Sequence, residues 1–209
     1  MFKSLYLSHL GLIISLVLNI FGSLKRPFMV YGHYCSTTKK YLKYTRISTS
    51  SIILDKRKLV INNYCWIGHH CIIDASGGLT LGEGVQISSL NSILTHSSHI
   101  SIRLLGRSFL DSNSSERQGY LKSPVSIGDY SFIGSGAIIL PGTNIGRGCV
   151  IGAGSVVKGE IPDFSVVIGN PAKIVGSTGV MDKEHLSTKE IVNTYFDKQQ
   201  YQNIRNNDF

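Results

Sequence analysis

The stretch from Ile127 to Lys158 decides the fold: IGDYSF IGSGAI ILPGTN IGRGCV IGAGSV VK. An aliphatic residue recurs at every sixth position, and a small residue follows each one four positions later. A period of six matches neither an α-helix, with about 3.6 residues per turn, nor the two-residue alternation of a plain strand. It indicates a short strand and a turn, repeated. Three such units form one triangular coil, and stacked coils bury the aliphatic column as a continuous core. The aliphatic positions are Ile127, Ile133, Ile139, Ile145, Ile151 and Val157.

The same repeat extends toward the N-terminus and is interrupted once. It recurs at Ile61, Ile67 and Ile73 and again at Leu81, Ile87 and Ile93, with a slip of two residues in the stretch DASGGLT. Between Ser98 and Leu121 about twenty residues leave the coil, and long insertions in a rigid solenoid usually carry function. The fold class is therefore all-β, a parallel β-helix of hexapeptide repeats.

The domain organisation follows from these boundaries. Ser187 to Glu190 (STKE) has the pattern of a capping box and predicts a C-terminal helix to about Gln199, followed by a polar tail. The predicted segments are a hydrophobic N-terminal helix at 1–30, a basic lead-in at 31–60, the β-helix at 61–176 with its loop at 99–121, and the C-terminal helix and tail at 177–209.

Charge is distributed unevenly along the chain. The net charge is +8, with 16% charged and 42% hydrophobic residues. Residues 1–58 contain ten Lys or Arg and one acid, whereas the remaining 151 residues contain 11 basic and 12 acidic side chains. The apolar content excludes a disordered chain, and the neutral body argues against a nucleic-acid binder that is basic all over.

The one long apolar stretch lies within this basic front end. Leu5 to Leu24 (LYLSHLGLIISLVLNIFGSL) is about as long as a bilayer-spanning helix, and Lys25 and Arg26 follow it as the positive-inside rule requires of a cytoplasmic body. Two alternatives remain open: a helix at the membrane surface, or a helix that packs its apolar stripe on protein.

The four cysteines show no C-x-x-C pair and demand neither disulfides nor zinc. Cys65, Cys71 and Cys149 occupy the small-residue position of their hexads, where sister hexads have Ser, Ala or Thr. We expect them to be buried packing residues with free thiols, which suits a reducing cytoplasm.

Two histidines stand where the coil gives way to the loop. His96 and His99 lie in ILTHSSHISIRLLG, and a neutral imidazole at the edge of a groove is a natural base for a hydroxyl proton. The adjacent His69 and His70 could contribute to a zinc site, but neighbouring residues on a strand point to opposite sides. No metal is therefore expected.

The late hexads and the closing VVIGNPAKIVG, over Ile127 to Gly176, resemble the hexapeptide-repeat acetyltransferases with a left-handed β-helix. The stretch from THSSH to IGDYSF resembles the subgroup that O-acetylates sugars and bacterial surface polysaccharides. The resemblance implies acetyl-CoA as donor and a homotrimer with three sites, each in a groove between neighbouring subunits. It also implies a catalytic histidine on the loop that leaves the coil, which His99 matches best, with His96 as the alternate.

The resemblance also suggests binding residues. The donor's pantetheine arm would run along late turns, where small residues let it approach the backbone, and lysines would meet CoA phosphates. Phe132, where family members often carry Trp, and Arg103 are the candidate acceptor contacts. The candidate donor contacts are Ser135, Gly136, Ala153, Gly154, Lys158 and Lys173.

The leading hypothesis is an O-acetyltransferase for a sugar hydroxyl of a surface polysaccharide or its precursor, acting at the cytoplasmic face of the membrane. His99 would take the hydroxyl proton in a ternary complex, with Ser135 as a candidate for stabilising the oxyanion and Asp111 or Glu116 as candidates for orienting the imidazole. The alternatives are an acetyltransferase for a small soluble sugar or antibiotic, a non-catalytic trimeric β-helix, and a metal-dependent β-helix hydratase.

Overall fold

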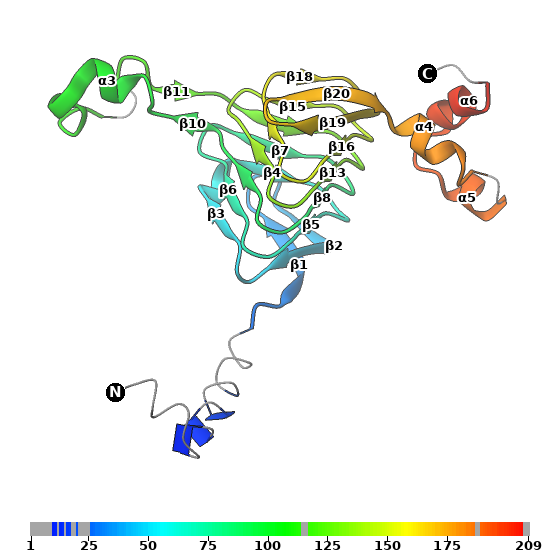
Figure 1. Ribbon diagram of the computed structural model, residues 1–209, viewed down its shortest axis with the longest axis horizontal. Helices are drawn as coiled ribbons and strands as arrows, with labels where there is room; N and C mark the ends of the chain where they lie inside the picture. Colours follow the sequence, from blue (N-terminus) through cyan, green and yellow to red (C-terminus); the bar gives the residue numbers. More distant parts are fainter. Residues whose placement is uncertain are drawn as a thin grey trace.

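The computed structural model describes residues 10, 11, 13, 14, 16, 17, 20, 26–113, 117–186 and 189–206. Within them the chain winds as a triangular solenoid of stacked parallel coils, with an arm on one side and short helices on the other (Figure 1). The predicted β-helix is confirmed.

Three sheets form the walls of the solenoid, and each coil contributes one strand to each wall. Sheet A contains β1 (Met29–Cys35), β2 (Lys40–Ser48), β5 (Trp66–Ile67), β8 (Gln86–Ile87), β13 (Phe132–Ile133), β16 (Val150–Ile151), β19 (Ser165–Gly169) and β20 (Ala172–Ser177). Sheet B contains β3 (Ile52–Leu54), β6 (Ile72–Asp74), β9 (Ser92–Ile93), β14 (Ile138–Ile139) and β17 (Val156–Val157). Sheet C contains β4 (Leu59–Ile61), β7 (Leu79–Leu81), β12 (Val125–Ile127), β15 (Asn144–Ile145) and β18 (Glu160–Ile161).

The core is the predicted aliphatic column. Ile61, Ile133 and Ile151, for example, are fully buried. Successive coils pair in parallel register and so place equivalent side chains on top of one another. Cys65, Cys71 and Cys149 are buried free thiols that donate to backbone carbonyls, so the expectation of packing residues is confirmed.

Antiparallel hairpins close both ends of the stack. β1 pairs with β2 before the first coil, and β19 pairs with β20 after the last one. β2 pairs in parallel with β5, and β3 pairs in parallel with β6. The short 3-10 helix η1 (Lys56–Lys58) then leads into β4, so residues 40–61 form the first coil. The solenoid thus begins before Ile61, where the regular hexads start.

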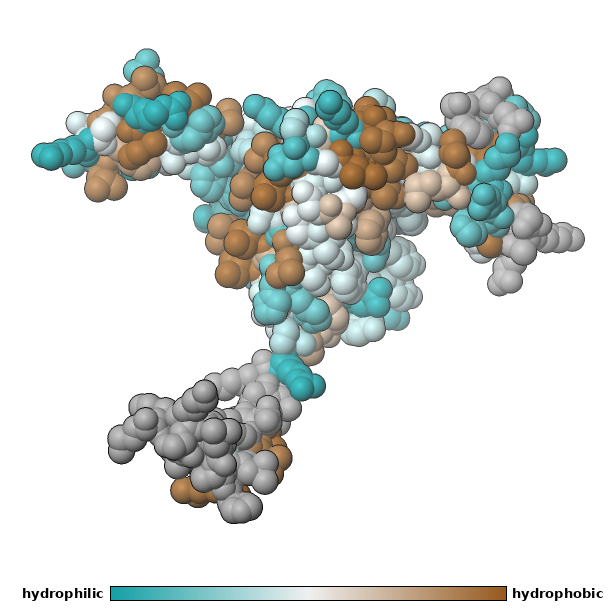
Figure 2. Space-filling model, viewed as in Figure 1, coloured by the Kyte–Doolittle hydropathy of each residue, from teal (hydrophilic) through white to brown (hydrophobic). Residues whose placement is uncertain are grey.

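The predicted loop leaves the stack between sheets B and C as an arm. Its base is a two-stranded antiparallel ribbon of β10 (His96–Ser97) and β11 (Leu121–Lys122), and its tip contains α3 (Ser101–Leu105) and the 3-10 helix η2 (Gly106–Phe109). Exposed aliphatic side chains, such as Leu104 and Leu110, gather on the tip (Figure 2).

The C-terminal region forms three short helices where the sequence predicts one to about Gln199. They are α4 (Thr178–Lys183), α5 (Lys189–Thr194) and α6 (Lys198–Asn206). The chain breaks before α6 because Asp197 Oδ1 accepts from the Gln200 N–H, and Phe196 packs its ring 4.7 Å from that of Tyr130. The capping residue Ser187 and the tail beyond 206 lie outside the described residues.

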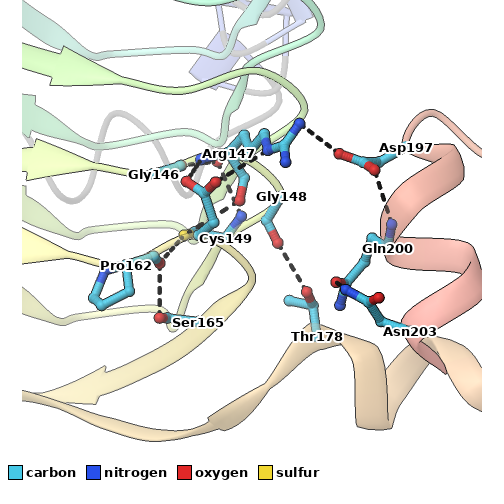
Figure 3. Close-up of polar contacts among 12 residues, drawn as sticks. Gly146, Arg147, Gly148, Cys149, Pro162, Ser165, Thr178, Asp197, Gln200 and Asn203 are labelled. Carbon is cyan, nitrogen blue, oxygen red and sulfur yellow. Dashed lines mark hydrogen bonds and ion pairs between the residues drawn. The ribbon is translucent and has the colours of Figure 1, made fainter. Parts of the chain in front are cut away.

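One arginine fastens these helices to the solenoid (Figure 3). The guanidinium of Arg147 lies 3.0 Å from the Asp163 carboxylate of the next coil and 2.6 Å from the carboxylate of Asp197, which is almost wholly buried. Thr178 Oγ1 donates to the Gly148 carbonyl beside it. The polar contacts therefore join three segments at one edge of the stack.

The predicted N-terminal helix falls mostly outside the described residues. Those described between 10 and 20 are helical, and Leu10, Ile13, Leu16, Val17 and Ile20 expose large parts of their side chains. In the described part of the chain, no helix is both long and apolar enough to cross a membrane.

Replacing Leu81, which is 0% exposed, by Ala should lower the free energy of unfolding by about 2–5 kcal/mol, because it removes buried surface and leaves a cavity in the column. The adjacent Thr80 points outward on the same strand, so Thr80→Ala should cost less than about 0.5 kcal/mol. Urea unfolding followed by circular dichroism measures both, and equal effects would contradict the assignment of the column as the core.

Arg147→Ala should loosen the C-terminal helices without unwinding the coils, because the nearly buried carboxylate of Asp197 loses its cation. Amide hydrogen exchange should become faster in α4 to α6 and stay unchanged in sheets B and C. The matched control is Arg57→Ala, whose fully solvated side chain faces Asp55 at the other end of the stack. Unchanged exchange in α6 would show that the ion pair does not hold the helices.

Candidate functional site

The candidate site lies at a widened turn between sheets B and C. In the late coil the aliphatic positions Ile139 and Ile145 are six residues apart, whereas Ile73 and Leu81 are eight apart. The two additional residues fall in the turn that follows β6. In the next coil, Thr95 and His96 follow β9 and lie on that turn. The slip seen in the sequence is therefore the place where side chains from two coils meet.

Asp74 is the buried centre of this turn. It is 1% exposed, and its Oδ2 accepts from the Thr95 N–H at 2.9 Å and from the Thr95 hydroxyl at 2.7 Å, while Oδ1 accepts from the Ser76 N–H at 2.9 Å. Burial alone would raise the pKa of Asp74, but the hydrogen bonds from Ser76 and Thr95 outweigh it and hold the pKa well below its usual range. The side chain is a carboxylate at neutral pH.

The third partner of this carboxylate is His96. Nδ1 of His96 lies 2.7 Å from Asp74 Oδ2 and 3.1 Å from the Ser76 hydroxyl. Because an ionised carboxylate only accepts, the proton of a neutral imidazole resides on Nδ1, and Nε2 carries the lone pair. The His96 side chain is 37% exposed, so a ligand can reach the ring. This arrangement is that of a base oriented by a buried acid.

Close packing keeps His96 in place from two sides. A Cβ on Gly77 would lie 2.4 Å from the Thr95 carbonyl oxygen, so only glycine allows the two coils to approach this closely. From the arm, Tyr120 stacks on the imidazole, with ring centroids 5.9 Å apart and an interplanar angle of 16°. The base of the arm and the widened turn together position the ring.

His99 has a different environment. It is exposed, and its Nδ1 pairs with the Ser97 hydroxyl at 2.7 Å instead of with a carboxylate. Arg103 donates to the His99 carbonyl, so this cation is engaged with the backbone of the arm. His99 and Lys158 share the lining of a small cavity of about 130 Å³, with Ser97, Leu121, Leu140 and Pro141. Lys158 thus lies near His99.

The remaining candidate donor contacts lie on another edge. Ser135, Gly136, Ala153 and Gly154 form the turns between sheets A and B in two successive coils, and all four are exposed. Gly136 and Gly154 have positive φ, and nothing lies within 4 Å of a Cβ placed on either. The outer surface of these turns is open to a thin ligand. The N–H groups of Gly136 and Gly154 donate to the carbonyls of Ser89 and Ser135 in the preceding coil, so a donor arm would bond other groups of these turns.

The acceptor candidate Phe132 and the phosphate-binding candidate Lys173 lie on sheet A, further from the histidines. Phe132 points outward from β13 and is 43% exposed, and Lys173 is exposed on β20. Sheet A is a different wall from the turn that holds His96, so a single subunit does not bring these residues together with the base. Asp111 is exposed on the arm, and Glu116 lies outside the described residues.

Cys65, Cys71, Cys149 and His69 are engaged elsewhere. Burial raises the pKa of the Cys65 thiol to about 12, and it raises the pKa values of Cys71 and Cys149, so these thiols are poor nucleophiles at neutral pH. His69 Nδ1 pairs with the Ser48 hydroxyl at 2.6 Å. In the described ranges, no three His, Cys, Asp or Glu side chains gather closely enough to hold a metal ion.

Sequence reasoning missed Asp74, Ser76, Thr95 and Tyr120. A signal was present for the aspartate, because the slip in the repeat placed an acidic residue at the end of β6, directly below the segment of the next coil in which His96 follows β9. Tyr120 carried no such signal, since its position against His96 depends on the fold of the arm.

Two comparisons of sequence agree on the repeat. Residues 124–159 match the family described as "Bacterial transferase hexapeptide (six repeats)". A serine acetyltransferase of Buchnera aphidicola is 34% identical over 159 residues, which is 76% of this chain and 52% of that protein. A Mycobacterium tuberculosis protein named "Probable acetyltransferase" is 55% identical over 58 residues, 28% of this chain and 19% of that protein. The chain spans about half the length of the first relative and a smaller share of the second.

A comparison of structures agrees on the fold. AntD, an N-acyltransferase from Bacillus cereus solved with dTDP and 3-hydroxybutyryl-CoA, superposes with a TM-score of 0.51 at 18% identity, over 68% of this chain and 86% of that one. The repeat, the stacked coils and the relatives identify the chain as one that resembles the hexapeptide-repeat acetyltransferases in sequence and in fold.

Proposed function

We propose that the chain is an acetyl-CoA-dependent O-acetyltransferase that acts on a sugar hydroxyl of a bacterial surface polysaccharide or its precursor. The observation that carries the proposal is the Asp74–His96 pair, which presents an unprotonated Nε2 at the base of the arm of a hexapeptide β-helix. The likeness to proteins named acetyltransferases supplies the donor, and the resemblance of the arm region supplies the acceptor class.

In the reaction, Nε2 of His96 accepts the proton of the acceptor hydroxyl as its oxygen bonds to the thioester carbonyl carbon. The carbonyl oxygen becomes an oxyanion that needs a hydrogen-bond donor, for which Ser135 is the candidate. When the carbon–sulfur bond breaks, His96 returns the proton to the departing thiolate, so the products are the ester and free CoA. Asp74 stabilises the imidazolium between these two transfers.

This proposal reverses the order that the sequence suggested, because it assigns the proton transfer to His96 and keeps His99 as the alternate. Both histidines stand at the exit of the coil, but only His96 has a carboxylate on Nδ1 that fixes the tautomer and balances the positive charge. His99 and Lys158 line the adjoining cavity, where they suit binding of a ligand near the base.

A homotrimer would assemble the complete site. The open turns of Ser135 and Gly154 lie between sheets A and B, whereas His96 lies between sheets B and C. In the assembly, the edge between sheets A and B of one copy must therefore face the edge between sheets B and C of its neighbour. The outward residues of sheet B include the exposed Ile72 and Ile138, which such packing would cover. A groove between copies would then hold the donor.

We place the enzyme in the cytoplasm, at the inner face of the cell membrane. The basic front end of residues 1–58 and the exposed aliphatic side chains between residues 10 and 20 support this location. Lipid-linked sugar precursors would be accessible there.

His96→Ala should lower kcat/KM for acetyl transfer by about 10²–10⁴-fold, since it removes the base. Release of free thiol from acetyl-CoA, measured with a panel of mono- and oligosaccharides and with mass spectrometry of the products, tests this. His99→Ala is the matched control and should reduce kcat/KM less than about tenfold. If His99→Ala is inactive and His96→Ala retains activity, the alternate base is the correct one. If no saccharide stimulates thiol release, the proposed activity is wrong.

The stability contribution of Asp74 should depend on pH. Because its folded-state pKa is depressed, its carboxylate stabilises the fold above the unfolded value of about 4, and this contribution is lost as the pH falls through the folded pKa. Asp74→Asn should therefore lower the free energy of unfolding by about 2 kcal/mol at pH 7, and the difference from the wild type should shrink below about pH 4.

Urea unfolding at several pH values measures this difference. Asp111→Asn, an exposed change on the arm, is the control and should show no such trend. A constant difference between Asp74→Asn and the wild type from pH 7 down to about pH 3 would contradict an ionised Asp74.

A further inference from the structure

The first coil and its hairpin form a surface that acetyl transfer does not use. Eight cations and one acid lie between residues 26 and 58, and the acid, Asp55, is already paired with Arg57 and Lys58. Figure 1 shows the β1–β2 hairpin at the end of the solenoid where the chain enters, away from the C-terminal helices. The positive charge is therefore concentrated at one end of the molecule.

Exposed tyrosines are interleaved with these cations on the hairpin. Tyr34 lies directly opposite Tyr41, and Tyr31 directly opposite Arg46, so each pair shares one face of the ribbon. Tyr31, Tyr34 and Tyr41 are 70%, 59% and 67% exposed. We call this the tyrosine–lysine surface, and it consists of Tyr31, Tyr34, Lys39, Lys40, Tyr41, Lys43, Tyr44 and Arg46.

The opposite face of the hairpin is the one that packs against the core. Cys35 and Leu42 are buried against the end of the core, and Thr45 and Ser48 are buried within β2. The tyrosines add nothing to that core. On their side Arg46 lies over Tyr31 at 5.6 Å and Lys43 lies over Tyr44 at 5.4 Å, and the Tyr44 ring also stacks on that of Tyr64 at 4.8 Å.

We propose that the tyrosine–lysine surface binds the headgroup region of an anionic membrane. Tyrosine is favoured at the membrane–water interface, where its ring is amphipathic, and each lysine or arginine near an anionic leaflet adds attraction. Leu10, Ile13 and Val17, on the helical residues that precede the hairpin, supply exposed aliphatic side chains for the acyl boundary. Stable peripheral binding needs two such signals, and this end of the chain has both.

A soluble acidic glycan is the rival ligand for tyrosines and cations. It would leave the exposed aliphatic side chains at Leu10, Ile13 and Val17 without a role, whereas a membrane accounts for them. The surface therefore fits a lipid bilayer better. The inference deepens the proposed location at the membrane and does not depend on the acetyl-transfer activity.

Sedimentation of the full chain with vesicles tests the proposal. One set contains phosphatidylcholine alone, and the other contains an equal mixture of phosphatidylcholine and phosphatidylglycerol. The wild type should prefer the anionic vesicles, and K39Q/K40Q/K43Q should lower its partition onto them by roughly 100-fold, since each cation contributes a factor of roughly five. The matched control K183Q/K198Q/R205Q removes the same charge from the C-terminal helices and should lower it less than about threefold.

Two further variants separate the parts of the surface. Y34S/Y41S should weaken binding to the anionic vesicles, and I13D/V17D should weaken binding to both kinds. Circular dichroism melting and acetyl transfer to a soluble acceptor without vesicles should match the wild type for K39Q/K40Q/K43Q, so a folding defect or an inactive wild type is recognised separately.

The proposal is overturned if the wild type binds phosphatidylcholine vesicles as well as anionic ones, if the two triple variants lose binding equally, or if no vesicle is bound. Retention of the wild type by dextran sulfate, lost in K39Q/K40Q/K43Q and without vesicle binding, would assign the surface to an acidic glycan instead.

Discussion

The parallel register between successive coils is the constraint on which the rest of the structure depends. Each inward aliphatic side chain sits on the equivalent residue of the coil below, and backbone hydrogen bonds lock that register along all three walls. A shift by one residue would turn every aliphatic side chain outward. The core therefore fixes where each turn lies on the surface, and with it the place of every functional group at an edge.

The candidate site uses this register at a point where the repeat is irregular. The turn after β6 is longer than its counterpart after β14, which gives room for Asp74 and Ser76, and the next coil places Thr95 and His96 on top of them. The carboxylate is buried and its hydrogen bonds come from rigid backbone and from Thr95, so it holds one charge and one orientation. The His96 imidazole is thus oriented by the stack, while the arm adds Tyr120 against its ring.

The hexad period predicted the solenoid, its core column and the buried cysteines, because burial in this fold repeats at fixed intervals. It also located both histidines and the arm. The period did not predict the contact between His96 and Asp74, because these residues are 22 positions apart and the turn between their coils has a length that breaks the period. The first coil was missed for a related reason: Ile53 and Ile61 are eight residues apart, with η1 between them. The break before α6 depends on how Phe196 packs on Tyr130, a tertiary contact without a local pattern.

We propose that Asp74 holds the proton of His96 on Nδ1 and leaves Nε2 as the base. Nitrogen-15 NMR of the histidine-labelled protein, at a pH where the imidazole is neutral, measures the tautomer directly, and the signal is assigned by its loss in His96→Gln. We expect a protonated Nδ1 and an unprotonated Nε2 for His96 in the wild type, and a changed or averaged tautomer in Asp74→Asn. A wild-type His96 that carries its proton on Nε2 would contradict it.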